Sequence, residues 1–61
     1  MNIHQKRIYK VAKLSHVMVL KNQKVNMNFK RHYKRTKAEY ANFSLDHLNT
    51  SIKFFKGCID G

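Results

Sequence analysis

The stretch KRIYKVAKLSHVMVL (residues 6–20) decides how this 61-residue chain folds. Its apolar residues recur at steps of three and four, which places them on one face of a helix. They are Ile8, Val11, Ala12, Leu14 and Met18. Most of the cations in the stretch fall away from this face, so residues 6–20 predict an amphipathic helix. The apolar run at residues 17–20 contains two valines and fits a short strand equally well.

A polar interval and a strongly basic segment follow. Residues 21–28 are rich in Asn and Lys and predict a turn or irregular connection. The basic segment then begins at residue 29 and is expected to be an irregular connector. Thr36 and Glu39 have the spacing of a capping box, which predicts a helix over residues 37–43.

The last third of the chain returns to the helical pattern. Ser44 is an N-cap candidate, and Asp46 follows in the first turn, where a negative charge suits the helix dipole. The apolar residues that keep helical steps from there are Leu45, Leu48, Ile52 and Phe55. The predicted fold class is mainly α. A single apolar core in so short a chain rarely supplies more than about 3 to 5 kcal/mol, so marginal stability is expected.

Charge is distributed very unevenly along the chain. The first 38 residues contain eleven Lys or Arg and no carboxylate, and the three acids are Glu39, Asp46 and Asp60. Charge of one sign at that density repels itself and is neutralised by a polyanion. We therefore expect a nucleic acid as partner, and charge alone does not choose between DNA and RNA. The expected phosphate contacts are Lys6, Arg7, Lys10, Lys13, Lys30, Arg31, Lys34, Arg35 and Lys37.

Aromatic residues are interleaved with the cations of the basic segment. Phe29, Tyr33 and Tyr40 could stack on bases if a single strand were the target. The alternative is that these rings pack on the core and leave only a basic helix face. Net charge favours phosphate contact, and nothing in the sequence specifies base stacking.

Several other classes of site have no support in the sequence. Cys58 is the only cysteine, so no internal disulfide forms, and a reduced cytoplasmic setting is the simpler expectation. The four histidines lack the close spacing of zinc modules, and we expect neither a metal nor another cofactor. The longest apolar run falls far short of a membrane span, and the first residues do not resemble a secretory signal.

Three segments resemble insertion-sequence transposases with a helix-turn-helix and an integrase-type catalytic domain. Asn2 followed by KRIYKVAK at residues 6–13 resembles the helix-turn-helix segment of that family. FKRH at residues 29–32 resembles the element that opens its basic connector. NTSIKFFKGCIDG at residues 49–61 resembles the approach to its first catalytic strand, although Phe stands where Trp is usual. The resemblance implies that Asp60 occupies the first metal-binding position of the Asp-Asp-Glu set.

The resemblance also implies a domain organisation. The chain would be a single small unit (1–61), a truncated fragment with a helix-turn-helix-like segment at 1–28. A basic connector and a C-terminal helical or apolar segment would occupy 29–61. One Asp cannot build a two-metal phosphoryl-transfer site, so we expect no catalysis and no enzyme. The expected function is DNA binding by a vestigial transposase fragment linked to transposition and DNA recombination.

Three alternatives remain open from the sequence. The first is a small basic RNA-binding protein of the ribosomal type. The second is a membrane-active cationic peptide that uses the helix at residues 6–20. In the third, the chain is a relic without function, and residues 54–61 form an apolar strand without a sheet, which predicts aggregation.

Overall fold

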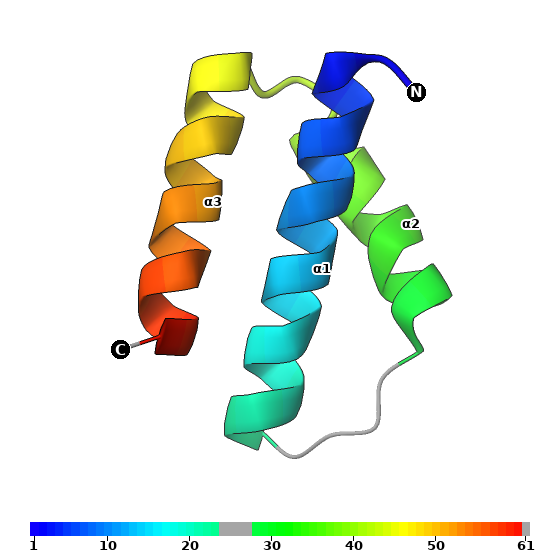
Figure 1. Cartoon of the computed structure of the whole chain (residues 1–61). Coiled ribbons are helices and arrows are strands. Elements are labelled where there is room, and N and C mark those ends of the chain that lie inside the picture. Colours follow the sequence, from blue (N-terminus) through cyan, green and yellow to red (C-terminus); the bar gives the residue numbers. More distant parts are fainter. Residues whose placement is uncertain (24–27, 61) are drawn as a thin grey trace.

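The computed structural model describes residues 1–23 and 28–60. Within them the chain forms three helices, α1 (Ile3–Gln23), α2 (Phe29–Tyr40) and α3 (Leu45–Asp60). The predicted mainly helical fold is therefore confirmed. α1 lies between the other two helices and packs against both (Figure 1). No helix in the described ranges is long and apolar enough to cross a lipid bilayer.

α1 begins at a reciprocal capping box. The Asn2 side-chain oxygen accepts a hydrogen bond from the Gln5 backbone N–H at 2.8 Å, and the Gln5 side-chain oxygen accepts one from the Asn2 backbone N–H at 3.1 Å. Both N–H groups would otherwise lack a partner at the helix start. The helix then continues unbroken through residues 17–20, so the strand alternative for that run is wrong.

The core is small and lies mainly between α1 and α3. Ile8 and Val11 of α1 pack with Leu48 and Ile52 of α3 as a cluster of buried side chains. The half-buried residues that pack around this cluster are Leu14, Tyr33, Tyr40 and Phe55. Val11 and Leu48 are fully buried. The free energy of folding is therefore concentrated in a few contacts at the middle of the molecule.

The basic segment expected to be an irregular connector is helix α2 instead. Its N-cap is Asn28, whose side-chain oxygen accepts the N–H of Lys30 at 2.9 Å and that of Arg31 at 3.4 Å. Asn is among the strongest N-cap residues, and the apolar side chains of α2 bury one face against α1. Of the interval predicted as a turn, residues 21–23 belong to α1, and residues 24–27 lie outside the described part of the chain.

The predicted capping box of Thr36 and Glu39 is wrong. Thr36 lies in the interior of α2, where it is buried and its hydroxyl donates to the backbone carbonyl of His32 at 2.9 Å. Glu39 accepts a hydrogen bond from Arg35 one turn earlier. Because α2 is already capped by Asn28 and starts at Phe29, Thr36 has no free N–H group to cap. Of the helix predicted over 37–43, residues 37–40 are the end of α2, and residues 41–43 are not helical.

α3 begins where the sequence predicts. The Ser44 hydroxyl accepts a hydrogen bond from the His47 backbone N–H at 3.2 Å. The helix runs to Asp60, so the strand expected as an alternative for 54–61 is wrong over the described residues 54–60. Near its end, Lys21 of α1 donates from Nζ to the Ile59 carbonyl at 3.0 Å, which places a cation at the negative end of the helix dipole.

Candidate nucleic-acid interface

α2 separates its aromatic and cationic residues onto opposite sides. The residues on the side toward the rest of the molecule are buried or half-buried, and they are Phe29, His32, Tyr33, Thr36 and Tyr40. All five predicted phosphate-binding residues of the helix are exposed, and they are Lys30, Arg31, Lys34, Arg35 and Lys37. The segment that the sequence marked as basic is thus a helix with a continuous cationic face.

Three of these cations form a row along α2. Lys30, Lys34 and Lys37 are spaced i, i+4 and i+7, which places them on one side of a helix. We call them the α2 lysine row. The same spacing occurs in α1, where Lys6, Lys10 and Lys13 are also exposed and form the α1 lysine row. All six were expected as phosphate contacts, and the repeated spacing is the signal in the sequence that predicts the two rows.

The two rows flank a seam where two tyrosines meet. The ring of Tyr9 from α1 contacts the ring of Tyr33 from α2 edge to face, with centroids 5.1 Å apart. Lys13 places Nζ 5.6 Å from the centroid of Tyr9, and Lys37 places Nζ 5.0 Å from that of Tyr33. These distances are within the range of cation–π attraction. One lysine of each row is therefore held beside the same aromatic contact.

The aromatic rings of α2 are engaged in packing between helices. Phe29 lies parallel to Tyr33 at 6.0 Å and meets His16 of α1 edge to face at 5.3 Å. Tyr40 contacts Phe43 edge to face at 4.5 Å, and it packs against the core. Of the two roles open to these rings, the structure shows packing, and all three rings are half-buried.

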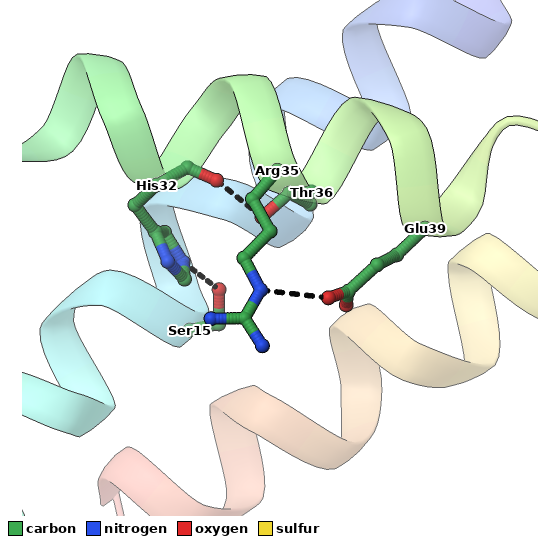
Figure 2. Close-up of polar contacts among 5 residues, drawn as sticks. All are labelled: Ser15, His32, Arg35, Thr36 and Glu39. Atoms are coloured by element: carbon green, nitrogen blue, oxygen red, sulfur yellow. Dashed lines mark hydrogen bonds and ion pairs between the residues drawn. The ribbon is translucent and has the colours of Figure 1, made fainter.

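A polar network joins α1 to α2 beside the aromatic contacts. The Ser15 hydroxyl lies 3.2 Å from the carbonyl of Ala12 and 2.7 Å from Nε2 of His32. The hydroxyl has a single proton, so the tautomer of His32 decides whether Ser15 donates to the carbonyl or to the ring. Figure 2 shows this contact together with the Thr36 hydroxyl bond and the Arg35–Glu39 pair, whose Nε and Oε1 are 3.0 Å apart.

The environment of His32 opposes its protonation. Burial lowers the pKa of this imidazole below its usual value, and the nearby His16 and Arg35 lower it further, while Glu39 raises it in part. The rings of His16 and His32 have centroids 5.6 Å apart. A proton on His32 would therefore lie in a partly desolvated site close to a second imidazole, so the neutral ring is the form that the fold favours.

An open groove of about 900 Å³ runs along α2 on the side of Arg31 and Arg35. Its lining residues are Val19 from α1 and Arg31, His32, Lys34, Arg35, Thr36, Ala38 and Glu39 from α2. The Arg35–Glu39 pair is the one ion pair within residues 1–23 and 28–60, and both side chains are largely exposed. The other cations of this face make no ion pair within the described part of the chain.

Two residues singled out in the sequence have different surroundings. Arg7, an expected phosphate contact, is half-buried, and its Nε is buried with no hydrogen-bond partner among the described atoms. Asp60 is exposed at the last position of α3. The transposase resemblance places the approach to a catalytic strand at residues 49–61, but residues 49–60 are helical because their apolar side chains pack at helical spacing against α1. In the described residues, no three His, Cys, Asp or Glu side chains are close enough to share a metal ion.

Two contacts of the structure have only weak signals in the sequence. His4 places Nε2 2.6 Å from the carbonyl oxygen of Phe43, which ties the start of α1 to the connection between α2 and α3. Ser15 and His32 are 17 positions apart, and neither residue type indicates the other. The Asn2–Gln5 capping box, by contrast, has a spacing that could have been recognised.

No protein-family model, curated protein or solved structure matches this chain.

Proposed function

We propose that this protein binds DNA through the sugar-phosphate backbone, as a non-catalytic basic fragment that works in the cytoplasm. The observation that carries the proposal is the cationic face of α2. Five exposed Lys and Arg side chains lie within 12 residues of one helix, and Glu39 is the only acid on that helix. Such a face has high positive potential and gains free energy when counterions are released from phosphates.

The proposal assigns phosphate contact, not base readout, to these side chains. Backbone contacts fix the position of a protein on DNA but carry no sequence information. The affinity is therefore expected to be nearly independent of sequence. It should also fall steeply with salt, with a slope of about −0.9 in log K against log salt for each phosphate contact.

The test is fluorescence anisotropy with two unrelated DNA duplexes over about 50 to 200 mM salt. We expect equal affinities for both duplexes and a steep salt slope. The double variant Lys34→Ala, Arg35→Ala should weaken binding to both duplexes equally and reduce the slope. An unchanged slope in the variant would refute the assignment of phosphate contact to α2.

The same assay separates the two rival partners. Structured RNA that binds more tightly than duplex DNA at equal salt would select the RNA-binding alternative. Anionic vesicles that bind the protein where DNA does not would select the membrane-active alternative. Either result would overturn the DNA proposal.

The relation to insertion-sequence transposases is part of the proposal and has a separate test. It is supported by the KRIYKVAK block at residues 6–13, which lies on one helix with its lysines exposed. Sequencing and translating the DNA on both sides of the gene tests it. A downstream reading frame with two further carboxylates of an integrase-type site would support the relation, and flanks that encode nothing of the kind would remove it.

A further inference from the structure

We propose that the seam between α1 and α2 is the surface that holds a double-stranded nucleic acid, with the two lysine rows on either side of it as the phosphate contacts. This inference rests on the proposed function and deepens it. It names which of the many cations make the contacts and which form of nucleic acid they fit.

The two lysine rows lie on either side of the same seam. Tyr9 and Tyr33 touch across the seam, and each carries the lysine four residues later over its ring. Lys13 and Lys37 therefore lie on opposite sides of one aromatic contact. The other members of each row follow at helical spacing on the same side of their helix. The seam is thus bordered by cations on both sides.

The number of lysine charges in the two rows can be compared with the number of phosphates beside them. Each row spans seven residues of helix and is therefore about 10.5 Å long. The axes of packed helices lie about 8 to 10 Å apart. A DNA duplex carries one charge per about 1.7 Å, so about six phosphates fall within one row length. A single strand offers about half that number. The six lysines therefore match the charge density of a duplex better than that of a single strand.

The two tyrosine rings at the seam are engaged in packing. Binding of single strands without sequence preference uses aromatic rings on which bases stack. Here the rings of Tyr9 and Tyr33 pack against each other and are covered by Lys13 and Lys37. Both rings are half-buried, and a base would have to displace these contacts in order to stack on them. In the absence of a polyanion, the two rows repel each other across the seam, and phosphates between them relieve that repulsion.

The test compares two double variants that remove the same charge. Lys10→Gln with Lys34→Gln takes one lysine from each row, and neither residue takes part in the tyrosine contacts. Lys53→Gln with Lys56→Gln removes two exposed lysines from α3, which lies on the other side of α1 (Figure 1). Circular dichroism confirms that both variants keep their helices. Binding of a labelled duplex and of a single strand of the same length is measured by anisotropy against salt.

We expect the row variant to lose about tenfold or more in duplex affinity, and its salt slope to fall by about two. The α3 variant should retain the slope of the wild type, and the wild type should bind the duplex more tightly than the single strand. Equal losses in the two variants, or tighter binding of the single strand, would overturn the seam assignment while leaving the proposed function standing. A wild-type protein without salt-dependent binding to any nucleic acid would end the proposed function and this inference together.

Discussion

Truncating Leu48 is the most direct test of where the fold gets its stability. Leu48 is fully buried against Ile8 and Val11, at the contact between α3 and α1. Leu48→Ala removes three carbon atoms, each worth about 0.8 kcal/mol of transfer free energy, and leaves a cavity that adds to the loss. The expected loss is about 2.5 to 5 kcal/mol, comparable to the whole free energy of unfolding expected for a chain of this size.

The matched control is Leu45→Ala in the same helix. Leu45 is 39% exposed and does not belong to the core cluster, so the same chemical change should cost less than about 1 kcal/mol. Urea unfolding followed by circular dichroism at 222 nm compares the two variants with the wild type. We expect Leu48→Ala to be largely unfolded in buffer and Leu45→Ala to unfold near the wild-type midpoint. Equal midpoints for the two variants would show that the α1–α3 contact does not hold the fold together.

Two further predictions concern the helix start and the histidine of α2. Asn28→Ala removes the N-cap of α2 and should lower the free energy of unfolding by about 1 kcal/mol, whereas Asn49→Ala on the exposed side of α3 should leave the urea midpoint nearly unchanged. Because burial lowers the pKa of His32 below its ordinary value of 6.5, the unfolded chain takes up a proton at this residue before the folded chain does. The contribution of neutral His32 to the free energy of unfolding is therefore complete above about pH 6.5, and it is lost as the pH falls toward the folded-state pKa. The urea midpoint should drop as the pH falls below about 6.5, and His32→Gln should reduce that drop; a variant with the full drop would contradict the role of His32.

The sequence predicts the helices better than their boundaries. The apolar steps of residues 6–20 and of Leu45 to Phe55 correctly predict α1 and α3, because a buried face leaves a periodic pattern. The start of α2 was predicted eight residues too late, since Thr36 and Glu39 fit the pattern of a capping box while Asn28 gives only a single-residue signal. Local patterns therefore reveal which face is buried but not which of two competing caps is used.

For the candidate site too, the sequence predicts local features but not the contacts between helices. The exposure of eight of the nine expected cations follows from helical spacing, and Arg7 is the exception because it is half-buried. The meeting of Tyr9 with Tyr33, which brings the two lysine rows together, depends on how α2 folds back on α1. No local pattern encodes that contact, because its partners are 24 positions apart in the chain.

The charge of the surface and the small size of the core are connected through binding. Each lysine row places like charges at i, i+4 and i+7, and such pairs lower the stability of an isolated helix by a few tenths of a kcal/mol each. A core that consists of a few buried side chains tolerates only a limited number of such pairs. A ligand that binds only the folded state adds RT ln(1 + [L]/Kd) to the free energy of unfolding, about 2.7 kcal/mol at a hundredfold excess over Kd. Under the proposed function, DNA therefore both neutralises the rows and supplies stability that the core alone does not provide.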